Sequence, residues 1–517
     1  MRFLFALLLL SFVNHPENRV DIIIRNGKIL DGTGNSWYLA DVAIKEGRIV
    51  KIGKLKNLAA DKEIDASGMY VTPGFIDVHT HIEGDEMANP EASNFIYDGV
   101  TSVVTGNCGS SVVDLNKYFM KLDSVKLSIN VASLIGHNDV RKAVMGTANR
   151  EPSADEFNSM KSLVEQAMKD GAVGFSTGLI YIPGTYSKTS EVVELAKVAA
   201  AYNGVYASHI RDEADSVVYA INEALRVGRE AGMPVEISHF KLSGQQNWGR
   251  SHETLDIVIA ARNQGLDVTI DQYPYTASST SLSTLLPEWV LSDGQDSINA
   301  RLQRPDVRKQ VKEYMISKLR RRKLKHFSFP VVASFKADST FNGKSIEQVN
   351  LMKGRKHRAD TEAETIVEMM EQGGAGMVFH GMSEEDVKLI MQYPFNMFAS
   401  DASIRIFNKG VPHPRGYGTN ARVLAKYVRD EKVISLEEAI RRMTSLPAQR
   451  FKLKDRGLLK EGYAADILVF NDKEVQDLST FEKPHQYTRG FKYVLVNGKV
   501  TVKDGVHNMV RNGQTLR

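Results

Sequence analysis

Residues 71–81 read Val71-Thr-Pro-Gly-Phe-Ile-Asp-Val-His-Thr-His81, an apolar segment that begins at a Pro-Gly turn and ends in two histidines. Short apolar runs next to turn residues are typical of buried strands, so we predict a strand here. Side chains two positions apart on a strand lie on the same face. His79 and His81 are therefore expected to point the same way, as two ligands of one metal site would.

Apolar strand-like runs alternate with amphipathic helical segments through the middle of the chain, which is typical of βα units around a parallel sheet. We predict eight such strands, the number that closes a (β/α)8 TIM barrel: residues 70–78, 99–105, 127–135, 172–177, 204–208, 234–238, 267–270 and 395–399. The expected fold class is α/β, with the barrel at residues 71–454. The segment from about residue 276 to residue 381 is too long to be one βα connection, which indicates an inserted subdomain.

Short β segments occupy both ends of the chain. One Asn-Gly pair, at residues 26–27, and another, at residues 497–498, each lie between β-like segments, and this dipeptide favours hairpins. We therefore expect residues 20–70 and 455–517 to form one small composite β-sandwich.

Residues 1–19 begin with an apolar run that is too short to span a bilayer and follows one positive charge. This pattern is typical of a signal peptide, and the competing interpretation is an uncleaved apolar tail. The protein is expected to be exported, to the periplasm or beyond, if the segment acts as a signal, and cytoplasmic otherwise. No other segment approaches transmembrane length.

Composition narrows the function classes. A net charge of +4 over 517 residues does not indicate a nucleic-acid partner, and the basic run at residues 318–325 is expected to be a solvated helix end. The single cysteine, Cys108, excludes an intrachain disulfide. It must be an inert core residue, a reactive thiol or a metal ligand.

Side chains that bind metals follow five of the expected strands. In a (β/α)8 barrel the chemistry gathers at the C-terminal ends of the strands. Each of these residues taken alone is more often a buried, hydrogen-bonded polar group, but their shared position on one rim predicts a metal centre. They are His79, His81, Cys108, His209, His239 and Asp401.

Longer motifs resemble those of the N-acyl-D-amino-acid deacylases, or D-aminoacylases, of the amidohydrolase superfamily. The resemblance covers nearly the whole chain after residue 20. Related dihydroorotases and hydantoinases commonly bridge two metals with a carboxylated lysine from strand four, and residues 172–177 contain no lysine. The motifs are residues 73–81, 99–109, 174–181, 208–211, 237–241, 271–275, 399–401 and 416–419.

The resemblance implies one Zn²⁺ held tightly by Cys108, His209 and His239. It also implies an adjacent, weaker site that shares Cys108 and is formed by His79, His81 and Asp401. Three nitrogen or sulfur ligands plus a solvent molecule are typical of catalytic zinc. Asp401 resembles the family's general base and acid, which carries a proton from the attacking water to the leaving nitrogen.

The resemblance also implies substrate contacts for a small-molecule N-acyl-D-amino acid. Tyr181 is expected to polarise the scissile carbonyl and to act in both binding and catalysis. Lys241 is expected to bind a substrate carboxylate, with a salt bridge at the rim as the alternative. Tyr275 and Met382 match further pocket positions.

Three residues outside these motifs are possible additional cations or rim residues. Lys336 is an alternative carboxylate-binding cation, while His137 and Arg141 are expected at the rim without an assigned role.

Two other functions stay open at this point. One is a different amide or cyclic-imide hydrolase of the same superfamily, such as a hydantoinase-like enzyme. The other is a non-catalytic scaffold that keeps the barrel. The sequence leaves the preferred acyl group, the preferred D-amino acid and the oligomeric state undetermined.

Overall fold

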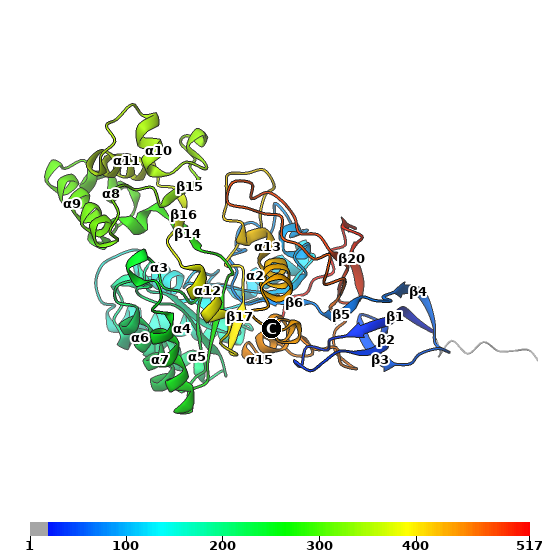
Figure 1. The fold of residues 1–517 in the computed structure, drawn as a ribbon. Coiled ribbons are helices and arrows are strands. Elements are labelled where there is room, and N and C mark those ends of the chain that lie inside the picture. Colours follow the sequence, from blue (N-terminus) through cyan, green and yellow to red (C-terminus); the bar gives the residue numbers. More distant parts are fainter. Residues whose placement is uncertain (1–18) are drawn as a thin grey trace, which may run out of the picture.

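A computed structural model describes residues 19–517 of the chain (Figure 1). The expected signal peptide or apolar tail lies outside the described residues. Within them, no helix combines the length and apolar character that crossing a bilayer requires.

The core of the molecule is built from nine parallel strands, and each of the eight predicted segments overlaps at least one of them. Six lie in one sheet with the order β17-β13-β12-β11-β10-β9, and three lie in another with the order β6-β7-β8. The bounds are β6 (Phe75–Asp77), β7 (Val100–Thr105), β8 (Asn130–Ser133), β9 (Ile135–Gly136), β10 (Gly174–Gly178), β11 (Val205–His209), β12 (Val235–Ile237), β13 (Val268–Gln272) and β17 (Asn396–Phe398).

The two parallel sheets approach each other at both edges. β8 and β9 are separated by Leu134 alone. At the opposite edges, Thr80 forms a parallel bridge with Ala402. The backbone N–H of Asp401 also donates to the carbonyl of His79 over 2.9 Å. The residues that follow β6 and β17 are thereby held side by side, although these strands are far apart in the sequence.

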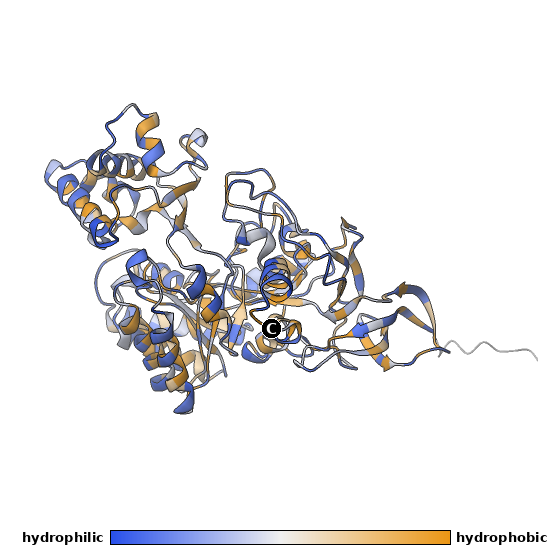
Figure 2. Cartoon of the chain, viewed as in Figure 1, coloured by the Kyte–Doolittle hydropathy of each residue, from blue (hydrophilic) through white to orange (hydrophobic). Residues whose placement is uncertain are grey.

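Amphipathic helices surround the parallel strands (Figure 2). A capping box starts α4, where Ser153 and Glu156 make both of its hydrogen bonds. The helices are α1 (Ser93–Ile96), α2 (Leu115–Val125), α3 (His137–Met145), α4 (Ala154–Lys169), α5 (Thr189–Ala200), α6 (Val217–Ala231), α7 (Ser251–Asn263), α12 (Glu384–Met391), α13 (Arg415–Arg422), the π-helix η7 (Val423–Asp430), α14 (Leu436–Met443) and α15 (Ser445–Arg450).

The prediction of one strand over residues 70–78 is wrong, because Gly74 divides this segment between two sheets. β5 (Tyr70–Pro73) pairs with strands from the chain ends, and β6 pairs with β7. A Cβ atom on Gly74 would lie 2.2 Å from Oγ1 of Thr101, so a side chain has no room at the crossing point. The parallel core therefore starts at Phe75, and the predicted barrel boundary at residue 71 falls within β5.

Strands from both chain ends form one nine-stranded sheet with the order β21-β20-β19-β18-β5-β1-β2-β3, in which β4 also pairs with β1. The two-layer β-sandwich stays a prediction. The bounds are β1 (Arg19–Ile29), β2 (Tyr38–Lys45), β3 (Arg48–Gly53), β4 (Ala59–Asp65), β18 (Ile467–Phe470), β19 (Phe491–Val496), β20 (Lys499–Lys503) and β21 (Val506–His507).

The two Asn-Gly pairs behave differently. Asn497 and Gly498 both have positive φ and join β19 to β20, so the predicted hairpin is confirmed there. The hairpin predicted at Asn26 and Gly27 is wrong, because β1 continues through both residues. A register shift between Ile24 and Gly27, with φ of 58° at Asn26, shows a β-bulge instead.

Residues 277–380, from β14 to β16, form a lobe at the upper left of Figure 1. Three antiparallel strands of this lobe pair in the order β14-β16-β15, and its helices share a hydrophobic cluster. Its elements are β14 (Ala277–Ser281), the 3-10 helices η4 (Leu282–Leu285) and η5 (Glu288–Val290), α8 (Gln295–Leu302), α9 (Pro305–Arg321), β15 (Pro330–Ser334), the 3-10 helix η6 (Ser339–Phe341), α10 (Ile346–Met352), α11 (Ala359–Glu371) and β16 (Gly376–His380).

Candidate metal centre

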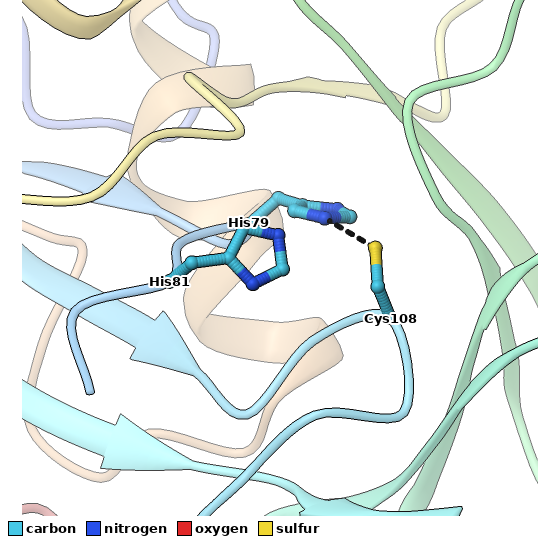
Figure 3. A group of neighbouring side chains, drawn as sticks. All are labelled: His79, His81 and Cys108. Atoms are coloured by element: carbon cyan, nitrogen blue, oxygen red, sulfur yellow. Dashed lines mark hydrogen bonds between the residues drawn. The ribbon is translucent and has the colours of Figure 1, made fainter. Parts of the chain in front are cut away.

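The predicted metal ligands meet where the parallel strands end. His209 is the last residue of β11, and the others lie in the loops after β6, β7, β12 and β17. Figure 3 shows His79, His81 and Cys108 directed toward one another. The ligand atoms form three overlapping groups, each within 4.8 Å: Cys108, His209 and His239; His79, His81 and Cys108; and His79, His239 and Asp401.

Three of these ligands have a left-handed backbone, which is uncommon for residues other than glycine. The φ angles are 53° at Cys108, 36° at His239 and 50° at Asp401. Such backbone strain clusters at functional sites because the surrounding structure must impose it. Here the strained residues turn the chain sharply after the strands and direct three side chains toward one point.

The separations around the Cys108 sulfur fit a tetrahedral zinc ion. Sγ of Cys108 lies 3.6 Å from Nδ1 of His209 and 3.6 Å from Nε2 of His239. Zinc bonds of about 2.3 Å to sulfur and about 2.0–2.1 Å to nitrogen place the two ligand atoms roughly 3.6 Å apart at a tetrahedral angle. The residue types and their spacing therefore suit zinc.

The surroundings of Cys108 favour the thiolate, which is the metal-binding form. Burial alone raises the pKa of the Cys108 thiol. The charge of His79 and hydrogen bonds involving His209 and His239 outweigh burial and hold this pKa well below its usual value. Nε2 of His79 lies 3.2 Å from the sulfur. These surroundings suit Cys108 to the role of a metal ligand.

Asp271, on β13, supports two of the ligands. Its Oδ2 lies 3.1 Å from Nδ1 of His79, and its Oδ1 accepts the backbone N–H of His239 over 2.9 Å. A carboxylate that binds the second nitrogen of a ligating histidine fixes the orientation of the ring. Asp271 belongs to the motif at residues 271–275, but its supporting role did not follow from the sequence. A carboxylate within an apolar strand was the available signal.

Asp401 lies between histidines and an arginine. Its Oδ1 is 3.3 Å from Nε2 of His81, and its Oδ2 is 2.9 Å from Nη1 of Arg415. Burial raises the pKa of Asp401, but the charges of Arg415 and His79 outweigh it and hold this pKa well below its usual value. Asp401 is therefore ionised and able to accept a proton. Arg415, which directly precedes the motif at residues 416–419, was missed.

Lys241 makes the ion pair that sequence analysis kept as an alternative. Its Nζ lies 2.5 Å from Oε1 of Glu213 and 2.9 Å from Nδ1 of His239. Burial lowers the pKa of Lys241, but the charge of Glu213 outweighs it and raises this pKa. Glu213, which the sequence did not single out, also lies 2.9 Å from Nδ1 of His239. The substrate role of Lys241 stays a prediction.

A cavity of about 190 Å³ opens beside the metal ligands His209, His239 and Asp401. Tyr181 and Met382 line it, as their predicted roles require. The Tyr181 hydroxyl lies 3.0 Å from Oγ1 of Thr280 on β14.

Tyr275 does not line this cavity, although sequence analysis predicted a substrate contact. Its ring packs on His413 at 5.1 Å and against the Arg422 guanidinium at 4.7 Å. Tyr273, two residues earlier in the same motif, lines the cavity instead.

The inserted lobe supplies the outer wall of the cavity. The basic run was expected to be a solvated helix end, yet Lys318 and Arg322 from this run line the cavity. The Arg322 guanidinium lies 4.8 Å from the ring centroid of Phe329. Among the described residues of this run, Arg321 makes an ion pair, with Asp215 at 3.8 Å, whereas Lys318 and Arg322 make none. The charges of Asp212 and Asp215 nevertheless act on Arg322. Periodicity could not reveal which side of α9 faces the cavity.

The other cations that the sequence offered for a substrate carboxylate lie elsewhere. Arg141 is fully buried and binds both oxygens of Glu191, at 2.7 and 2.6 Å, so its guanidinium already has a carboxylate partner. His137 joins the same carboxylate at 2.9 Å. Lys336 is exposed and lines none of the cavities described. The first two residues form a structural ion-pair network on α3 and α5.

Comparison with known proteins places the chain in a family. The amidohydrolase family model matches residues 62–302 and 340–502, and the urease alpha-subunit N-terminal domain model matches residues 10–75. A D-aminoacylase of Alcaligenes xylosoxydans xylosoxydans is 34% identical and covers 92% of this chain and 93% of its own length. The N-acyl-D-glutamate deacylase of the same organism is 34% identical, with 93% of each chain covered.

Several solved structures have the same fold as this chain. A D-aminoacylase crystal structure has a TM-score of 0.83 at 32% identity and covers 96% of this chain and 99% of that chain. The N-acyl-D-glutamate deacylase of Bordetella bronchiseptica, complexed with zinc and a phosphonate inhibitor, has a TM-score of 0.81 at 34% identity, with coverage of 96% and 100%. A D-hydantoinase has a TM-score of 0.58 at 18% identity, a likeness of fold alone, with coverage of 96% and 98%. This chain has the TIM-barrel-type α/β fold of D-aminoacylase and belongs to the amidohydrolase family.

Proposed function

We propose that this protein is a zinc-dependent hydrolase that cleaves the amide bond of N-acyl-D-amino acids to a carboxylate and a free D-amino acid. The observation that carries the proposal is the placement of ionised Asp401 beside the group formed by Cys108, His209 and His239. Relatives at 34% identity are named D-aminoacylase and N-acyl-D-glutamate deacylase, and they match nearly the whole chain.

We also propose how the chain divides into domains. A (β/α)8 barrel that begins at Phe75 and extends to residue 454, with the insertion at about 276–381, holds the catalytic centre, while β5 belongs to the sheet of the chain ends. Residues 20–70 and 455–517 form the composite β-sandwich. Cys108, His209 and His239 hold one zinc ion tightly, and His79, His81 and Asp401 form the weaker site that shares Cys108. When bound, zinc would act as a Lewis acid and would lower the pKa of a bound water molecule, so that a nucleophile is available at neutral pH.

Asp401 moves the proton that amide hydrolysis requires. As an ionised carboxylate it accepts a proton from the attacking water and then delivers it to the leaving nitrogen. Tyr181 donates a hydrogen bond to the scissile carbonyl. Burial raises the pKa of Tyr181 well above its usual value, so the phenol keeps its proton for this bond. Lys241 and Glu213 hold His239 in place from the side away from the sulfur.

The cations of the inserted lobe favour an acidic substrate. Lys318 and Arg322 line the cavity and make no salt bridge with a described residue, although the charges of Asp212 and Asp215 act on Arg322 from nearby. A charged group in a cavity wall is costly unless it is paired, and a substrate carboxylate would provide the partner. We therefore infer a preference for N-acyl derivatives of acidic D-amino acids. N-acyl-D-glutamate, named for one relative, is an example.

Activity assays with matched substrates test the proposal. Purified, zinc-loaded protein is given N-acetyl-D- and N-acetyl-L-amino acids together with a cyclic imide. Hydrolysis of the D-series is expected, with metal and activity both lost in Cys108→Ala. Cleavage of the cyclic imide alone would favour the hydantoinase-like alternative, against which the absence of lysine in β10 already argues. Zinc binding without hydrolysis of any substrate would favour the scaffold.

A further inference from the structure

A second group of metal-binding side chains lies in the inserted lobe, outside the catalytic centre. His326 precedes β15, Glu347 is on α10, His357 is in the loop between α10 and α11, and Glu362 is on α11. One ligand atom from each residue lies within 4.8 Å of the other three. Four chain segments that are separate in sequence thus bring two imidazoles and two carboxylates to one point.

The contacts within this group form two histidine–carboxylate pairs. Nδ1 of His326 lies 2.7 Å from Oε1 of Glu362, and Nε2 of His357 lies 2.5 Å from Oε1 of Glu347. The two imidazole rings stack with centroids 3.8 Å apart and planes inclined by 20°. Each histidine therefore has one ring nitrogen at a carboxylate oxygen, and the ring stacking brings the two pairs together. A divalent cation at this point would be within reach of both nitrogens and both carboxylates, and its charge would offset that of the two glutamates.

Glu362 is oriented as ligating carboxylates usually are. Its side chain is fully buried, and its second oxygen, Oε2, accepts the backbone N–H of Phe327 over 2.7 Å. Hydrogen bonds of this kind fix the direction of a metal ligand. A buried carboxylate also needs compensation for its lost hydration. A partly exposed histidine alone compensates less than a doubly charged cation does.

We propose that His326, Glu347, His357 and Glu362 bind a divalent transition-metal ion of the zinc class. Two nitrogen and two oxygen ligands with no cysteine suit Zn²⁺, Co²⁺ or Ni²⁺ better than Mg²⁺ or Ca²⁺, which prefer oxygen alone. The ion ties α10 and α11 to the segment that enters β15. Phe327, next to His326, lines the substrate cavity, so the site also stabilises the cavity wall.

Zinc content distinguishes this site from the catalytic centre. Full-length protein is saturated with zinc, desalted and measured for zinc per chain. His326→Gln/His357→Gln is expected to carry about one zinc fewer than the unsubstituted chain. The matched control is His252→Gln. His252 is an exposed histidine on α7, and its ring is hydrogen-bonded to the carbonyl of Gly249. Equal zinc content in the double variant and the control would overturn the proposal.

A binding measurement in Cys108→Ala removes the contribution of the catalytic centre. Zinc is added to this chain, and both heat of binding and thermal unfolding are followed. Zinc is expected to bind and to raise Tm. Both effects are expected to be lost in the double variant Cys108→Ala/His357→Gln. His357 is suited to this test because its side chain is half-exposed. Unchanged binding in this double variant, or full competition by excess Mg²⁺, would contradict the assignment.

Discussion

Nδ1 of His79 lies 3.1 Å from Oδ2 of Asp271. A carboxylate on β13 therefore orients a histidine in the loop that follows β6. The same carboxylate accepts the backbone N–H of His239. Asp271 therefore supports two candidate ligands, His79 and His239, that are 160 positions apart in the sequence (239 − 79).

Asp271→Asn is expected to weaken zinc binding by about 10- to 100-fold, because such supporting carboxylates typically contribute that much to metal affinity. All predicted zinc ligands remain in this variant. Competition with a chelator of known affinity measures the change. An unchanged zinc affinity would show that the aspartate has no supporting role.

Asp401→Asn is expected to keep the tightly bound zinc and to lower kcat by about 10²- to 10⁴-fold, because the amide preserves the shape but cannot accept a proton. Zinc content and kcat are measured on the same preparation. His239→Ala is the contrasting variant, in which zinc and activity are lost together because one of three tight ligands is removed. Near-normal turnover in zinc-loaded Asp401→Asn would exclude the proton-transfer role.

The buried network around Glu191 predicts a pH-dependent contribution to stability. Burial raises the pKa of Glu191, but hydrogen bonds and charges from His137 and Arg141 outweigh it and lower this pKa. A carboxyl group with a lowered folded-state pKa stabilises the fold above its unfolded pKa, about 4.3. That stability is lost as the pH falls through the folded-state value.

Glu191→Gln is therefore expected to lower the free energy of unfolding at pH 7 by about 3–5 kcal/mol, since Arg141 is left buried without its charge partner. Urea unfolding at pH 7 and at successively lower pH measures this loss, and the difference from the unsubstituted chain should shrink below about pH 4. Glu194→Gln, on the same helix but with a 41% exposed side chain, is the control, with a change of about 0–1 kcal/mol. Equal losses in the two variants would contradict the network.

Local patterns in the sequence predicted the parts of this structure that depend on local chemistry. Each of the eight apolar runs overlaps at least one of the nine parallel strands, and the strand ends located the candidate metal ligands. Gly74 was misread because a change of sheet depends on Thr101, a residue from another strand. The bulge at Asn26 has the same dipeptide as a hairpin turn, and only pairing with β2 distinguishes the two.

Long-range pairings in the site were equally hidden. Asp271 and His79 are 192 residues apart, and Glu213 and Lys241 are 28 apart. No periodicity in the sequence relates such partners. The cavity cations on the inserted lobe were hidden for the same reason, since helix α9 reaches the catalytic centre only through the packing of the whole lobe.

Arg322 provides the sharpest test of substrate class. If its guanidinium binds a side-chain carboxylate, Arg322→Met removes a charge-assisted hydrogen bond of about 1.5–3 kcal/mol, which corresponds to a loss in kcat/KM of roughly 10- to 100-fold. The loss is expected for N-acetyl-D-glutamate and not for N-acetyl-D-leucine, because methionine keeps the apolar contact with Phe329 that both substrates can use. Arg320→Met, an exposed substitution near the same end of α9, is the control and should change neither value. Equal losses for the two substrates would assign Arg322 to packing of the cavity wall, and the preference for acidic D-amino acids would then be wrong.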